Sequence, residues 1–221
     1  MTETNALEVS WVPLISGGVL KVTIPDSTVN FLNQVTDYIL SDEDDLTSLN
    51  MEDRLAGQLK NGKQRAIPLT DDTKKNIAIA NFLTFSNNLC LEYLKTYSEI
   101  IPRADRWGDS PGVEIYDLWV NQQLQGDYNP MHSHAQAGPC LSSVLYLKVP
   151  QQINDTTEDG SLRFFWGDRG NTNMLEYPQI LSIVPKPGDY YIFPSWVIHE
   201  VLPFRDEGER RSVSWNARVW V

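Results

Sequence analysis

The second half of the chain alternates between short hydrophobic segments and clusters of turn-forming residues. The hydrophobic segments are rich in β-branched and aromatic side chains, and clusters such as GDYNP, EDG and PKPGD separate them. This pattern is typical of the strands of an all-β sandwich or barrel. We expect strands at residues 113–121, 141–149, 161–166, 179–184, 189–193 and 211–221.

The first half has longer hydrophobic periods, which indicate helices. Residues 19–24 alternate weakly and stop at Pro25, as a short strand would. A helix is expected next, with a packing face made of Phe31, Leu32, Val35, Tyr38 and Ile39. A longer helix is expected over residues 72–100, ended before Pro102, with an apolar and aromatic stripe that packs against a sheet.

These patterns predict a mainly β protein with helices. A length of 221 residues allows one large domain. We expect residues 1–110 to form an N-terminal α/β scaffold packed on the core of the same domain, and residues 111–221 to form the β core.

Composition and charge exclude several classes of partner. The net charge is −11 and no basic stripe interrupts the chain, so nucleic acid is not expected to bind. The acidic run at residues 42–45 is expected to be a solvated loop. Cys90 and Cys140 form no disulfide framework, and neither a leader-like segment nor a long apolar run is present. We therefore expect a cytoplasmic protein without a membrane partner.

The candidate chemistry lies in the three histidines of the chain. His132 and His134 form a His-x-His pair, and His199 follows 65 residues after the second. Residues i and i+2 of a strand face the same side, so one metal ion can meet both imidazoles and a third from a neighbouring strand. Such a face with open positions suits non-haem Fe(II), although imidazole also binds zinc, copper or nickel.

A polar face is expected on the last strand. Alternation places five side chains on one side, namely Arg210, Ser212, Ser214, Asn216 and Arg218. A guanidinium and a hydroxyl two residues later can hold a carboxylate by charge-assisted hydrogen bonds. Arg211 takes the place of Arg210 if the strand register is shifted by one residue.

These residues carry a family resemblance over residues 113–219. The order of a His-x-ligand pair, a distal histidine and Arg-x-Ser resembles the 2-oxoglutarate- and Fe(II)-dependent oxygenases, whose fold is a double-stranded β-helix, or jelly roll. LSSVLYLKVP and PGDYYIFPSWVIHEVLP are similar to segments of the prolyl-hydroxylase-like members. The H-x-H pair and the terminal R-x-S-x-x-x-N are similar to a group of oxygenases from marine bacteria and their phages.

The resemblance implies that Fe(II), 2-oxoglutarate and dioxygen act together. His132 and His199 would bind iron. Arg210 and Ser212, with Tyr146, would hold the distal carboxylate of 2-oxoglutarate. The expected reaction is hydroxylation of a protein side chain or a small molecule, with release of succinate and carbon dioxide; the sequence predicts neither the substrate nor the oligomeric state.

The chain departs from the family pattern at one ligand. The second position of the pair is usually acidic, and here it is His134. His134 is the expected third ligand, and three acidic residues remain as alternatives, namely Asp127, Asp159 and Asp168.

Two other functions remain open. A cupin-like metalloenzyme also starts from H-x-H, but it has a glutamate a few residues later, where this chain has Ala135-Gln136-Ala137. A jelly-roll binding module without chemistry is the second alternative. Four side chains are candidates for the mouth of the site, namely Trp119, Asn121, Tyr128 and Trp166.

Overall fold

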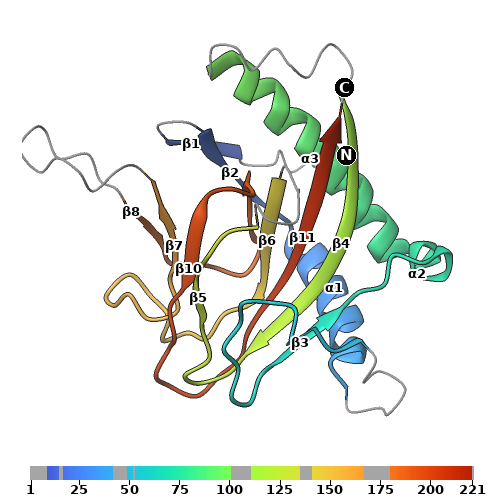
Figure 1. The fold of residues 1–221 in the computed structure, drawn as a ribbon. Coiled ribbons are helices and arrows are strands. Elements are labelled where there is room, and N and C mark those ends of the chain that lie inside the picture. The colour runs from blue at the N-terminus through green and yellow to red at the C-terminus, as the bar shows by residue number, and fades with distance from the viewer. Residues whose placement is uncertain are drawn as a thin grey trace, which may run out of the picture.

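Two antiparallel sheets form the centre of the molecule, and helices cover one of them (Figure 1). The computed structural model describes residues 9–14, 17–41, 49–51, 53–100, 111–134, 141–166 and 180–220. The expected acidic loop and two of the sequence candidates, Cys140 and Asp168, lie outside these residues. Among the described helices, none has the length and apolar character needed to cross a membrane.

The larger sheet has seven strands in the order β1-β2-β9-β6-β11-β4-β3. Their bounds are β1 Val9–Leu14, β2 Gly17–Thr23, β3 Lys63–Ala66, β4 Gly112–Gln123, β6 Leu141–Lys148, β9 Asp189–Pro194 and β11 Arg210–Trp220. The smaller sheet has four strands in the order β5-β10-β7-β8. Their bounds are β5 Asn129–His132, β7 Leu162–Phe165, β8 Ile180–Ile183 and β10 Ile198–Val201.

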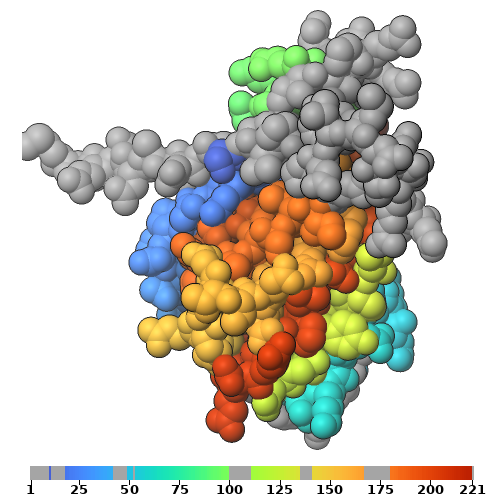
Figure 2. All heavy atoms as spheres, turned by 90° about the vertical axis from the view of Figure 1, so that its left-hand side faces the viewer, coloured from blue at the N-terminus to red at the C-terminus, as the bar shows by residue number. Residues whose placement is uncertain are grey.

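The N-terminal strands belong to the same sheet as the C-terminal ones. β2 pairs with β9, and β3 pairs with β4, so the chain before residue 110 extends both edges of the larger sheet. Seen from the side of the smaller sheet, blue N-terminal and cyan segments lie on opposite flanks of the orange centre (Figure 2).

Each of the six strands expected in the second half is present, and the mainly β fold is confirmed. The short strands β5 and β10 were not assigned from the sequence, because four-residue strands carry too little alternation to be recognised. The weak alternation before Pro25 corresponds to β2, and β1 and β3 were not expected.

The helices differ from the expectation in two places. The predicted helix over 72–100 is two helices, α2 Asp71–Lys75 and α3 Ile77–Ile100, because Asn76 has an extended backbone. Helix α1, Asp26–Ile39, buries Val29 and Leu32, whereas Phe31 and Tyr38 of the expected face are exposed. Leu32 and Ile39 of the expected face are buried and Val35 packs against the core, so the prediction was wrong only at its two aromatic residues.

The core has two layers. Apolar residues of α1, α3 and the outer face of the larger sheet form one cluster. The second cluster lies between the sheets and includes Tyr146, Phe164 and Phe193, with the two phenyl rings 4.8 Å apart. On β11, Val213, Trp215 and Ala217 face the helices, so the side chains between them face the smaller sheet.

Candidate metal and co-substrate site

The three histidines meet at one end of the smaller sheet. His132 is the last residue of β5, and it lies opposite His199 in the antiparallel pair of β5 and β10. His134 follows β5, and its backbone N–H donates to the carbonyl of Ser195 at 2.8 Å. One candidate ligand atom from each ring lies within 4.8 Å of the others. A single metal ion can therefore contact all three imidazoles.

Backbone carbonyls orient two of the rings. The Nδ1 of His132 lies 2.7 Å from the carbonyl oxygen of Pro130, and the Nδ1 of His199 lies 2.9 Å from that of Val197. Because a carbonyl oxygen only accepts, each Nδ1 carries the proton, and each Nε2 keeps a lone pair. This is the usual support of a metal-binding histidine.

Side chains orient the third ring. The Nδ1 of His134 lies 2.7 Å from the amide oxygen of Asn216, which also accepts a hydrogen bond of 2.8 Å from the Ser142 hydroxyl. The Nε2 of His134 is therefore also left with a lone pair. The chain thus supports His134 in the same way as the other two histidines, with an oxygen acceptor on the far nitrogen.

Burial keeps the three imidazoles neutral. Loss of solvation lowers the pKa of His132 and of His134, and it lowers the pKa of His199 furthest. The neighbouring imidazoles lower the pKa of His199 further. A neutral imidazole is the form that binds a metal ion, so this donor set fits Fe(II) in its protonation state.

No carboxylate of the described residues joins this cluster. Asp127 is buried and accepts three backbone N–H groups, those of Lys60, Gly62 and Leu124. Asp159 lies 3.5 Å from Arg205. The structure therefore brings His134 to the other two histidines, and it brings neither of these two aspartates there.

A cavity of about 360 Å³ lies in front of the histidines. Its wall includes alternate side chains of β4 and β11, namely Trp119, Asn121, Gln123, Ser212, Ser214 and Asn216. Of the expected mouth residues, Tyr128 and Trp166 are not among those that line it. Arg218 is exposed, and its guanidinium lies 4.2 Å over the ring of Tyr116.

Arg210 lies beneath this wall. It is 1% exposed and does not line the cavity, whereas its neighbours Gln123, Tyr146 and Ser212 do. Its hydrogen bonds go to the side-chain oxygen of Gln123 and to two backbone carbonyls, and no carboxylate of the described residues pairs with it. Burial lowers its pKa to about 10, so it remains charged at neutral pH.

Tyr146 presents an unused hydroxyl beside this cation. Its ring is 1% exposed and lines the cavity, and its hydroxyl has no hydrogen-bond partner among the described residues. Burial raises its pKa to about 12, so the hydroxyl keeps its proton and can donate. A buried donor and a buried cation without a counter-ion fit a carboxylate ligand.

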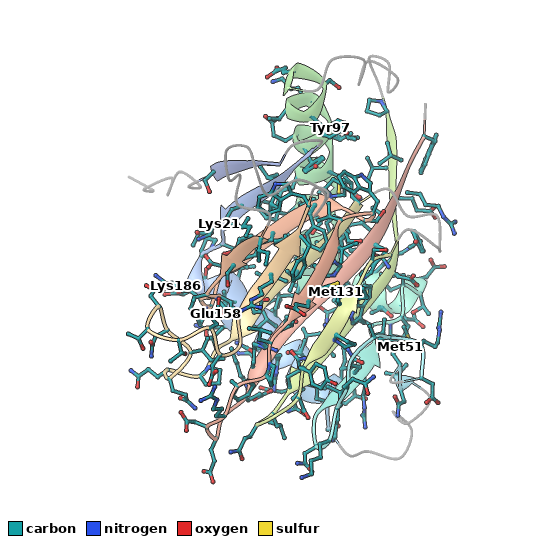
Figure 3. The ribbon with its side chains drawn as sticks, turned by 60° about the vertical axis from the view of Figure 1, so that its left-hand side comes forward. Lys21, Met51, Tyr97, Met131, Glu158 and Lys186 are labelled. Atoms are coloured by element: carbon teal, nitrogen blue, oxygen red, sulfur yellow. The ribbon has the colours of Figure 1, made fainter. Side chains whose placement is uncertain are left out.

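The segment before β3 completes the cavity. Met51, Arg54 and Ala56 line it together with the residues of the β core (Figure 3 labels Met51). Asp127 holds this segment through the N–H groups of Lys60 and Gly62. The rim of the cavity therefore comes from the N-terminal half of the chain.

Sequence reasoning missed several of these residues. Asp117 and Gln123 of the second wall were missed, although their alternation with Trp119 and Asn121, two of the expected mouth residues, was an available signal along β4. Ser142 carried no signal, because its role depends on contacts with residues distant in the chain. The rim residues before β3 likewise carried no signal in the sequence.

Comparisons with known proteins agree with this geometry. Residues 117–216 match the model of a family described as "Putative 2OG-Fe(II) oxygenase". The match includes all three histidines, Arg210 and Ser212. No curated protein gives a match.

Solved structures share the fold. A Pseudomonas putida prolyl-4-hydroxylase is 20% identical, with a TM-score of 0.58 and coverage of 92% of this chain and 94% of its own. The α-ketoglutarate-dependent epimerase SnoN of nogalamycin biosynthesis is 14% identical, with a TM-score of 0.58 and coverage of 91% and 78%. HygX from Streptomyces hygroscopicus, solved with nickel and 2-oxoglutarate, is 10% identical, with a TM-score of 0.56 and coverage of 92% and 83%.

The double-stranded β-helix expected from the sequence is thereby confirmed. The family match also favours the oxygenase over the cupin-like and binding-module alternatives. Over residues 117–216, a little under half of its length, the chain is therefore similar to the 2-oxoglutarate- and Fe(II)-dependent oxygenases.

Proposed function

We propose that the chain is a hydroxylase in which His132, His134 and His199 hold Fe(II). Arg210, Tyr146 and Ser212 hold the distal carboxylate of 2-oxoglutarate. The observation that carries the metal assignment is that one ligand atom from each of the three imidazoles lies within 4.8 Å of the others, while the Nδ1 hydrogen bonds leave each Nε2 with a lone pair. The unpaired Tyr146 hydroxyl and the Arg210 charge support the co-substrate assignment.

The residues of the chain bind, orient and shield the reactants. Fe(II) and 2-oxoglutarate held there would supply the activation of dioxygen that hydroxylation needs, with 2-oxoglutarate consumed to succinate and carbon dioxide. The Phe193 ring, 4.9 Å from the ring of His199, keeps one side of the site apolar. The Asn216 amide oxygen keeps the proton of His134 on Nδ1.

The substrate we propose is a protein side chain or a small molecule. A cavity of about 360 Å³ is at the lower end of the range for ligand sites, and it must also hold 2-oxoglutarate. Only the reacting end of a larger substrate therefore enters. Among proteins of similar fold, one is a prolyl-4-hydroxylase and another, HygX, was solved with hygromycin B bound.

The test is anaerobic titration with Fe(II) and then with 2-oxoglutarate. We expect a visible charge-transfer band that needs both additions. His132→Ala and His199→Ala should lose tight iron binding and the band while circular dichroism remains that of the parent protein. Met131→Ala is a matched control, because Met131 precedes His132 in β5 and its side chain is 51% exposed (Figure 3).

Two outcomes separate the parts of the proposal. Unchanged iron affinity in both histidine variants would rule out the metal site. If His134→Ala binds iron as tightly as the parent does, His134 is not a ligand, and the site has two histidines with an acidic partner elsewhere.

A further inference from the structure

Gln123 lies between the buried cation and the cavity. It is the last residue of β4, it is 4% exposed and it lines the cavity, whereas Arg210 does not. In the sheet, Gln123 lies opposite Arg210. Gln123 is therefore one of the side chains, with Tyr146 and Ser212, that lie between Arg210 and the cavity.

The contact occupies one edge of the guanidinium. The side-chain oxygen of Gln123 accepts from Nε of Arg210 at 3.1 Å and from Nη2 at 2.7 Å. Nη1 donates to the carbonyl oxygens of Gly160 and Leu202. Four of the five N–H groups are thus satisfied by neutral oxygens, and one N–H of Nη2 remains.

The far side of the Gln123 amide is also held. Its Nε2 donates to the side-chain oxygen of Asn129 at 2.8 Å. Asn129 begins β5, the strand that ends at His132. A hydrogen-bonded chain therefore runs from Arg210 through Gln123 to the strand that carries a histidine of the metal site.

Every hydrogen-bond acceptor of Arg210 among the described residues is neutral. Asp127 interacts with Arg210 electrostatically, but its carboxylate accepts its hydrogen bonds from three backbone N–H groups. A charge buried without a counter-ion is costly, and it attracts an anion that can replace the lost solvation.

We infer that Gln123 is a positioning residue for the co-substrate: it orients Arg210 and, because its amide is neutral, it leaves the guanidinium charge available to the distal carboxylate of 2-oxoglutarate. This inference rests on the proposed role of Arg210. A glutamate at this position would be an internal counter-ion and would compete with the co-substrate. An amide therefore has a function here that a carboxylate of the same shape cannot perform.

The experiment is calorimetric titration of the Ni(II)-loaded protein with 2-oxoglutarate. Gln123→Glu should weaken binding by at least about tenfold, because it neutralises the cation. Gln123→Met removes the hydrogen bonds but adds no charge, so the loss should be smaller than for Gln123→Glu. Gln125→Glu adds the same charge at an exposed turn position and should leave affinity unchanged.

A second ligand distinguishes the effect of the added negative charge from a general loss of ligand binding. 2-Oxopentanoate has the chain length of 2-oxoglutarate but ends in a methyl group. Its affinity should be nearly the same in the parent and in Gln123→Glu. Asn129→Asp places a carboxylate one hydrogen bond further away at a half-buried position, and it should weaken 2-oxoglutarate binding less than Gln123→Glu does. If Gln123→Glu does not fold, Asn129→Asp with the same two ligands decides the question.

Three results would overturn the inference. They are equal loss of both ligands in Gln123→Glu, a greater loss in Gln123→Met than in Gln123→Glu, and unchanged 2-oxoglutarate affinity in Gln123→Glu. In each case Arg210→Ala shows whether the proposed co-substrate site survives. If Arg210→Ala also binds 2-oxoglutarate normally, the co-substrate site itself is wrong and the inference fails with it.

Discussion

Arg210 and Arg211 are consecutive residues of β11, and both are almost fully buried, at 1% and 3% exposed. Arg211 lies 2.6 Å from Asp37 and 2.6 Å from Glu209, and it also donates to the Thr36 hydroxyl. Arg210 has only neutral acceptors among the described residues. The arginine on one face of β11 therefore has carboxylate partners within the chain, and the arginine on the other face has neutral acceptors among the described residues.

The difference favours Arg211 as the structural arginine and Arg210 as the one proposed to bind the co-substrate. Arg211 faces α1 and joins it to the sheet through ion pairs within the chain. Arg210 faces the space between the sheets, near the unpaired Tyr146 hydroxyl. Burial alone does not mark a functional cation, because both are buried. The absence of a counter-ion among the described residues is the more informative feature. Burying an unpaired charge costs free energy, and proteins keep such a charge where a ligand offsets that cost.

The strongest test of this comparison is removal of the Arg210 charge. Arg210→Ala should weaken 2-oxoglutarate binding by about 2–5 kcal/mol, the range for loss of one partner of a buried charge pair. Calorimetric titration measures the loss, and iron binding should persist. Parent-like 2-oxoglutarate affinity in this variant would contradict the assignment of the two faces.

The complementary change tests the structural face. Arg211→Met should lower the free energy of unfolding by about 2 kcal/mol, less than for a fully buried pair because Asp37 is largely exposed. Denaturant unfolding measures it. The 2-oxoglutarate affinity should equal that of the parent. A selective loss of that affinity would mean that the co-substrate uses Arg211.

The histidine cluster and the ion pairs of Arg211 should also lose their contributions to stability in different pH ranges. The folded-state pKa of His199 is lowered, so below about pH 6.5 the unfolded chain binds more protons. The metal-free protein should therefore lose up to about 1.4 kcal/mol per pH unit from this residue as pH falls. Arg211 and Lys148 lower the pKa values of Asp37 and Glu209, so their contribution is lost only near pH 4 and below.

Thermal unfolding of the metal-free protein from pH 8 to pH 3 measures both windows. In His199→Asn, the loss of stability below about pH 6.5 should be smaller than in the parent. In Arg211→Met, the loss of stability near pH 4 and below should be smaller than in the parent. An upper window that is unchanged in His199→Asn would show that His199 is not buried in the neutral form.

The smallest effect is expected at Tyr146. Tyr146→Phe removes one hydrogen bond to the co-substrate and should weaken 2-oxoglutarate binding by about 1 kcal/mol. Stability should not fall, because the hydroxyl has no partner among the described residues. Tyr191→Phe is the matched control, since its hydroxyl donates to Asp189 at 3.0 Å. The control should lose stability and keep its affinity for 2-oxoglutarate, and the reverse result would exchange the two roles.

Much of the fold could be predicted from local pattern. Strand β6 is long and largely apolar, and β11 is long and alternates polar with apolar residues, so both could be recognised without their neighbours. The short strands β5 and β10 could not, because their pairing partners lie far away in the sequence. The break at Asn76 was missed although its signal is local, since the Asn76 side chain accepts from the N–H groups of Ala78 and Ile79 at the start of α3. On α1, only Phe31 and Tyr38 differed from the expected buried face, because the elements that α1 packs on cover one side of the helix and leave these two rings exposed.

For the site, the sequence alone determined the candidate chemistry. Three histidines and an Arg-x-Ser pair on alternating strands are readable because ligand identity and strand period are local properties. Only the tertiary structure decided that Gln123 and Asn216 support Arg210 and His134, and that the segment before β3 forms the rim. These contacts join residues more than eighty positions apart, or come from a segment with no pattern of its own, and only packing brings them together.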